Sequence, residues 1–78
     1  MTPSYRLSRH AQQRMLERHV VESNAEEVLA SPDSAQHDPN QRSYRLEKRL
    51  AQGVLKVWVV QPWPPVGTVQ VKSVAWKD

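Results

Sequence analysis

After a short alternating stretch at 5–8, the spacing of apolar residues along this chain of 78 residues changes near residue 34. Before that point apolar residues recur three and four positions apart, which is typical of amphipathic helices. After it they alternate with polar residues, which is typical of half-buried strands. Helices over roughly 9–18 and 22–30, followed by short strands, predict the α+β class, because such helices must pack on the sheet that follows them.

Capping residues support both predicted helices. Ser8 is a candidate cap for the first helix, since its hydroxyl can accept a bond from a free N–H of the first turn. In the second helix the run Ser-Asn-Ala-Glu has the form of a capping box, in which Ser23 caps and Glu26 reaches back. The Ser-Pro-Asp at 31–33 ends this helix, because the residue before a proline avoids the helical region.

The strands are recognised by their alternation. They are predicted over 5–8, early in 35–43, and over 43–50, 54–61 and 68–76. The run at 54–61 is rich in β-branched and aromatic residues, which favour strands. The loop Pro-Trp-Pro-Pro-Val-Gly cannot belong to a strand. This order predicts a single domain over 1–78, with both helices on one face of a small twisted antiparallel sheet and a short first strand before them.

Composition excludes several classes of protein. The chain has no cysteine, so no disulfide and no thiolate metal site contributes to it. The start of the chain lacks the apolar core of a signal peptide, and no apolar run approaches the ~20 residues that span a bilayer. We therefore expect a cytoplasmic protein. His10, His19 and His37 lack metal-site spacing, and two glycines are too few for a glycine-rich phosphate loop. We predict no metal and no cofactor.

Charge is unevenly distributed along the chain. Residues 1–20 carry four arginines and one acid, and residues 21–40 carry five acids and no Lys or Arg. Residues 41–78 carry seven basic residues and two acids, which brings the net charge to +3. Basic ends are consistent with a polyanionic partner. An excess this small is also common in proteins that bind no nucleic acid, so the charge alone decides little.

His10, Arg14 and Arg18 are spaced four residues apart in the first predicted helix. At that spacing they form one stripe along the helix. A histidine can exchange a proton near neutral pH, and an arginine fork can grip phosphate oxygens. The stripe also fits a solvated helix face, on which an arginine pairs with Glu17, Glu22 or another acid of the second helix. Both interpretations are open on the sequence.

Basic residues also recur on the predicted strands. Arg45 and Arg49 share one strand face, and Lys56 and Lys72 lie on neighbouring strands. If that face is exposed, the four side chains form a basic platform that could bind RNA. The alternative is that they only solvate an open sheet.

The three tryptophans have several possible roles. Trp58 shares a face with Lys56 and could stack on a base, as could Trp76 beside Lys72. A small core without phenylalanine needs its aromatic residues, so both could instead be core. Trp63, between prolines, is either an anchor for a protein partner or a lid that packs on the domain.

The segment from His10 to Asp33 resembles a small bacterial family known as a domain of unknown function. That family has the pattern H-A-x-x-R-M-x-x-R-G-(I/V), then acids, then V-L-x-x-P-(D/E). The matching residues here are His10, Ala11, Arg14, Met15, Arg18, Val20, Glu26, Glu27, Val28, Leu29, Pro32 and Asp33. His19 stands where the family has glycine, at a position expected to end the helix in a left-handed conformation. Val21 replaces the family's frequent serine cap, which moves the expected cap to Ser23.

The family is grouped with RelE-like toxins and with the barnase–colicin–RelE ribonucleases. The resemblance therefore implies a RelE-like fold and metal-independent cleavage of RNA, free or on the ribosome. His10 would be the general base or acid, Arg14 and Arg18 would hold the phosphate, and Arg45 or Lys72 would stabilise the pentavalent oxyanion. A toxin of a toxin–antitoxin or mobile-element system would also have a cognate antitoxin as partner.

A second function is kept open by the lack of a clear second acid or base for His10. In this interpretation the chain is a non-catalytic binding or inhibitory module of a phage or mobile element. It would dock on a nucleic acid or a nucleoprotein complex, with Trp63 as its anchor.

Overall fold

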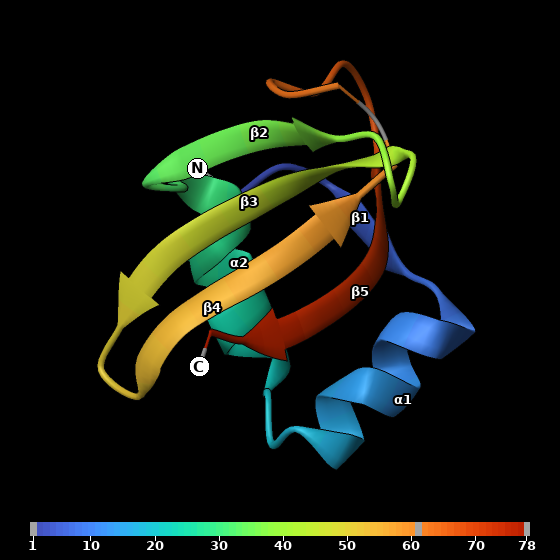
Figure 1. Cartoon of the computed structure of the whole chain (residues 1–78). Coiled ribbons are helices and arrows are strands. Elements are labelled where there is room, and N and C mark those ends of the chain that lie inside the picture. Colours follow the sequence, from blue (N-terminus) through green and yellow to red (C-terminus); the bar gives the residue numbers. More distant parts are fainter. Residues whose placement is uncertain (1, 61, 78) are drawn as a thin grey trace.

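In the described part of the chain, residues 2–60 and 62–77, five strands form one sheet and two helices pack beside it (Figure 1). The computed structural model has the elements β1 (Tyr5–Leu7), α1 (Arg9–Glu17), α2 (Glu22–Ala30), β2 (Ser34–Asp38), β3 (Ser43–Leu50), β4 (Gly53–Val59) and β5 (Val69–Trp76). The predicted α+β class and the order of the elements are confirmed. Neither helix is long and apolar enough to cross a membrane.

The sheet is mixed, with the strand order β1-β5-β4-β3-β2. Strands β2 to β5 form an antiparallel meander, whereas β1 pairs in parallel with β5. The prediction of an antiparallel sheet is therefore wrong at this edge. Short turns force consecutive strands to be antiparallel, but β1 and β5 are joined by the rest of the domain, so no local signal sets their relative direction.

One face of the sheet forms the core. Its buried residues on β3, β4 and β5 are Leu46, Leu55, Val57, Val59, Val69, Val71 and Val74. Helix α2 lies across this face over β3 and β4 and adds Val28 and Leu29 (Figure 1). Helix α1 lies beside β5 and contacts β1, and it adds Ala11 and Met15 to the same cluster. Each such side chain removed from water stabilises the fold by roughly 1.5–3 kcal/mol if it is a large aliphatic residue.

The two ends of α1 follow the predicted signals. The hydroxyl of Ser8 accepts a hydrogen bond of 2.9 Å from the backbone N–H of Ala11, as expected of a cap. At the other end His19 has a φ of 55°, the left-handed conformation predicted for it. This conformation turns the chain directly into α2.

The start of α2 differs from the prediction that Ser23 caps it. The helix begins at Glu22, with Val21 as its N-cap. The backbone N–H of Val21 donates to the side-chain oxygen of Asn24 at 3.1 Å. The side chain that bonds back to the N-cap is therefore Asn24, and not the predicted Glu26. Val20 is buried in the core, and this anchors the chain just before the helix.

Helix α1 covers an edge of β5 that no strand covers. Because β1 is short, it pairs only with residues 69–71 of β5. Beyond them the Ser8 hydroxyl donates to the carbonyl of Lys72 at 3.1 Å, and Arg18 Nη1 donates to the carbonyl of Val74 at 2.7 Å. In return, Trp76 Nε1 donates to the carbonyl of Arg18 at 2.8 Å. These bonds satisfy edge carbonyls that would otherwise need water, and they fix α1 against the sheet.

Candidate functional site

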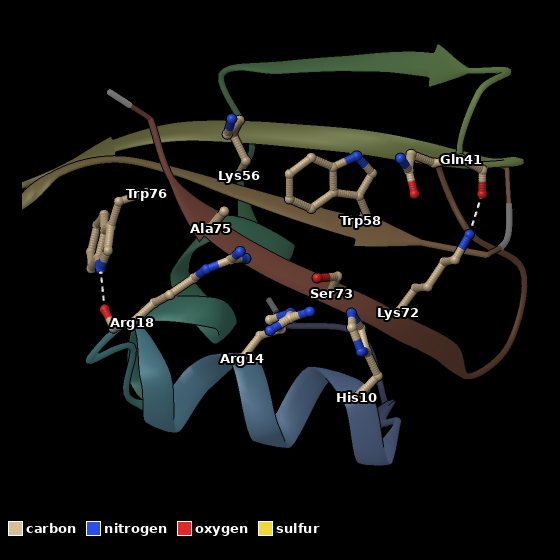
Figure 2. A pocket seen from close by; sticks show the side chains of 10 residues that line it. All are labelled: His10, Arg14, Arg18, Gln41, Lys56, Trp58, Lys72, Ser73, Ala75 and Trp76. Atoms are coloured by element: carbon tan, nitrogen blue, oxygen red, sulfur yellow. Dashed lines mark hydrogen bonds between the residues drawn. The ribbon is translucent and has the colours of Figure 1, made fainter.

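A groove lies between α1 and the face of the sheet that α2 does not cover (Figure 2). Its volume is about 650 Å³, within the range of roughly 300–1,000 Å³ common for ligand clefts. The lining residues come from α1, the β2–β3 turn, β4 and β5, and they are His10, Arg14, Arg18, Gln41, Lys56, Trp58, Lys72, Ser73, Ala75 and Trp76. We call this surface the basic groove.

Strand geometry brings these residues together. In β4 the residues alternate, so Lys56 and Trp58 face away from the core. In β5 a bulge intervenes, because Trp58 pairs with Ser73 while Val59 pairs with Val71. Lys72 is the extra residue, and both it and Ser73 line the groove. Sequence alternation pointed to Lys56 and Lys72 but gave no signal for this bulge, for Ser73 or for the turn residue Gln41.

The groove is strongly electropositive. Four of its side chains carry a permanent positive charge, His10 is a fifth basic group, and the described lining contains no carboxylate. The acids of α2 face elsewhere: Glu22 and Glu26 accept hydrogen bonds from the Tyr5 hydroxyl at 2.7 and 2.8 Å. A concave surface with cations of one sign attracts and concentrates an anionic ligand.

The two arginines of α1 each make one bond within the protein. Arg14 Nη1 lies 2.5 Å from a carboxylate oxygen of Glu17, which is the intrahelical pair that the sequence allowed. The hydrogen bond from Arg14 holds the pKa of Glu17 below its usual range. Arg18 makes the bond to Val74 described above. Because a guanidinium has five N–H donors, each arginine keeps donors for a ligand.

His10 is the one imidazole in the described lining of the groove. Its side chain is exposed, and within the described residues its imidazole has no hydrogen bond to another group. Figure 2 shows the ring on the groove side of α1, on the same side as Arg14 and Lys72. Unlike His10, Lys72 has a partner, since its Nζ donates to the backbone carbonyl of Gln41. Among residues 2–60 and 62–77 no group occupies either imidazole nitrogen of His10, so both can contact a substrate.

Trp58 and Trp76 take different roles. Trp76 packs partly against the core, whereas Trp58 has no place in the core cluster or against it. The indole N–H of Trp58 donates to Asp38 Oδ2 at 3.3 Å, and the ammonium of Lys56 lies 5.5 Å from its ring centroid. Of the two interpretations that the sequence left open, core packing fits Trp76, whereas Trp58 lies partly buried in the groove.

Arg45 and Arg49, two of the four predicted RNA-binding residues, do not line the groove. Arg45 Nη2 donates to the side chain of Gln36 at 2.8 Å, and its Nε lies 3.0 Å from Glu47 as an ion pair not aligned for a hydrogen bond. Arg49 is exposed, and its backbone N–H donates to Asp33 at 2.9 Å. Both lie on β3, one strand farther from α1 than the Lys56 of β4.

Trp63, the predicted partner anchor, lies outside the groove. It is half-buried and packs against the core cluster, in the loop between β4 and β5. Its peptide bond to Pro64 is cis. This position corresponds to the alternative in which the proline-rich loop packs on the domain as a lid.

In residues 2–60 and 62–77, no three His, Asp or Glu side chains lie together as a metal site. Comparisons of the chain with protein-family models, with curated proteins and with solved structures find no match. The resemblance to the RelE-like ribonucleases therefore stays a prediction, and the groove itself is the basis for inferring a function.

Proposed function

We propose that the protein binds RNA in the basic groove and cleaves it without a metal ion, as a RelE-like ribonuclease toxin of a toxin–antitoxin or mobile-element system. One observation carries this proposal: four permanent cations converge with a histidine that has no hydrogen-bond partner among the described residues, on a groove whose described lining has no carboxylate. Fixed cations can stabilise a phosphoryl transition state where a metal ion would otherwise do so. An inhibitory antitoxin is the protein partner that such an activity implies.

The chemistry is an attack of an RNA 2′-hydroxyl on its own phosphate. His10 accepts the proton of the 2′-hydroxyl while the new oxygen–phosphorus bond forms. The bond to the 5′ oxygen breaks, and that oxygen takes a proton from water in the open groove. The hydroxide that remains takes back the proton from the His10 imidazolium, which restores the neutral base. Arg14 and Arg18 hold the non-bridging oxygens, and Lys72 stabilises the charge of the pentavalent state. The products are a 2′,3′-cyclic phosphate and a free 5′-hydroxyl, so atoms and protons balance.

The first test is cleavage of a defined messenger RNA in a bacterial translation extract, with the new ends mapped by primer extension. We expect the wild type to produce new ends, and His10→Ala to slow cleavage by roughly 10²- to 10⁴-fold. Arg14→Ala should slow it as well. Arg49→Ala is the matched control, because it removes a cation outside the groove, and it should cleave like the wild type.

Two further arms sharpen this test. Purified RNA with a chelator, without ribosomes, separates ribosome dependence and metal dependence from the chemistry itself. Far-UV circular dichroism shows that each variant is folded. Intact RNA with the wild type, or equal cleavage by the wild type and His10→Ala, would overturn the proposal.

A second candidate function is RNA binding without cleavage, on a nucleic acid or a nucleoprotein complex. It is favoured by the absence of a second imidazole or carboxylate in the described lining to protonate the leaving oxygen. Arg18 also has a structural bond to β5, so its place in the row has a second explanation. Salt-sensitive binding of RNA with no new ends would support this candidate.

A further inference from the structure

Trp58 is the one large aromatic residue of the described groove that does not also pack against the core. We infer that Trp58 is a stacking site for an unpaired base, so that the groove takes single-stranded RNA rather than a duplex. The inference rests on the proposed RNA binding and names the substrate class of that same site. It does not depend on cleavage.

Trp58 lies on the open face of the sheet and does not pack against the core cluster. Every second residue of β4, from Leu55 to Val59, is buried, and Trp58 falls between them on the other side. An indole is among the largest apolar surfaces that a side chain can bury, and here part of it stays open to solvent. A second apolar surface, such as the face of a base, would cover it.

The indole is also held in place before any ligand arrives. Asp38 accepts a hydrogen bond from its N–H, and Lys56 stands over its ring as a cation–π partner. Two contacts from two different strands restrict the side-chain rotation of Trp58. A base that stacks on it therefore loses less of its binding free energy to ordering the protein.

Small residues leave room beside the ring. In the sheet Trp58 pairs with Ser73 and Lys56 pairs with Ala75, and β5 lies between β4 and α1. The short side chains of Ser73 and Ala75 form a floor, with the Trp58 indole on one side and Arg14 of α1 on the other (Figure 2). A nucleotide in this trench can place its base on Trp58 and its phosphate toward α1.

A duplex cannot use this arrangement. In an A-form helix each base is stacked on its neighbours and paired inside, so a side chain reaches only its edge in a groove. Stacking on an indole requires a base that is turned out of the stack, as in loops and single strands. Cations alone would accept both forms, so the indole makes the difference between them.

The test is a binding titration, followed by fluorescence anisotropy, with a labelled ten-nucleotide 2′-O-methyl RNA. This probe keeps its bases and phosphates, but its blocked 2′-oxygen prevents cleavage. The same sequence as a duplex and inorganic polyphosphate are the comparison probes. The variants are Trp58→Leu, which removes the ring, and Trp58→Phe, which keeps a smaller one. Trp63→Leu is the matched control, the same substitution outside the groove.

We expect Trp58→Leu to weaken binding of the single strand by roughly 5- to 150-fold, the range that corresponds to one stacked base. Trp58→Phe should recover part of that loss, and polyphosphate should bind all variants alike. The duplex should bind the wild type more weakly than the single strand does. Trp63→Leu should bind the single strand like the wild type at temperatures where it is folded.

Equal affinity of Trp58→Leu and the wild type for the single strand would overturn the inference, as would a parallel loss of polyphosphate binding. These results would leave the proposed ribonuclease standing. Conversely, uncleaved natural RNA together with a Trp58-dependent affinity would overturn cleavage and keep the stacking site. A wild type that binds no RNA probe would overturn both.

Discussion

The two faces of the sheet are built from the same strands but have opposite chemistry. On the face under α2, β4 presents Leu55, Val57 and Val59, all fully buried. On the opposite face the same strand presents Lys56 and Trp58 to the basic groove. The difference follows from where the helices lie, because α2 lies across one face of the sheet while α1 lies along its edge (Figure 1). The basic groove lies beside α1 on the other face.

This separation predicts a division of roles. The covered face excludes water, so changes there should act on the free energy of unfolding. The open face keeps its charges in solvent, so changes there should act on ligand binding. Arg18 is where the two roles meet, since it lines the groove and also bonds to a carbonyl of β5.

The largest expected effect comes from the covered face. Leu46 is fully buried on β3, the strand between β2 and β4. Leu46→Ala should lower the free energy of unfolding by about 2–5 kcal/mol. Lys56→Ala, on the neighbouring strand but the open face, should change it by less than about 0.5 kcal/mol. Urea unfolding followed by tryptophan fluorescence measures both. Similar losses of unfolding free energy in the two variants would contradict the division of roles between the two faces of the sheet.

A smaller effect on the free energy of unfolding is expected at Arg18, which has both roles. Arg18→Ala removes one of the bonds that tie α1 to the edge of β5, and it should lower the free energy of unfolding by about 1 kcal/mol, a value reduced for partial exposure. Arg14→Ala should leave stability almost unchanged, because its bond to Glu17 is exposed. Both should weaken RNA binding. If Arg14→Ala destabilised the fold as much as Arg18→Ala, the assignment of Arg18 as the link would be wrong.

The smallest expected effect concerns the Tyr5 hydroxyl, near the covered face, and it is seen at alkaline pH. Burial, and then the hydrogen bonds and charges of Glu22 and Glu26, raise the pKa of the Tyr5 hydroxyl above its ordinary value of 10. The folded state thus holds its proton more tightly than the unfolded state does. The resulting stability is fully present below pH 10 and is lost as the pH rises above 10.

Thermal unfolding from pH 8 to 11.5 measures this effect. Tyr5→Phe has no proton to lose, so it should show a flatter decline than the wild type over that range. The cations of the open face remain the same in both proteins and serve as the internal control. Identical slopes for the two proteins would contradict the role of Tyr5.

Local patterns alone were sufficient for part of the fold and of the site. Alternation in the strand over 54–61 placed Lys56 and Trp58 on one face, and four-residue spacing placed His10, Arg14 and Arg18 on one stripe. The cap at Ser8 also followed from residue type, and the left-handed His19 followed from the glycine that the resembling family has at this position. These features depend on interactions within a few residues, which a sequence reveals directly.

Other features depend on contacts between segments far apart in the chain, and only the tertiary structure decided them. The parallel pairing of β1 with β5 and the seating of α1 on the edge of β5 determine which face α1 leaves open. The bulge at Lys72 determines which residues of β5 line the groove. Arg45 and Arg49 have the right charge, and strand alternation places them on the open face. Their strand nevertheless lies too far from α1 for them to share the groove. Amino-acid spacing therefore determined the chemistry that each element carries, while long-range packing decided which elements meet, because the free energy of their contacts belongs to the assembled sheet and not to any one segment.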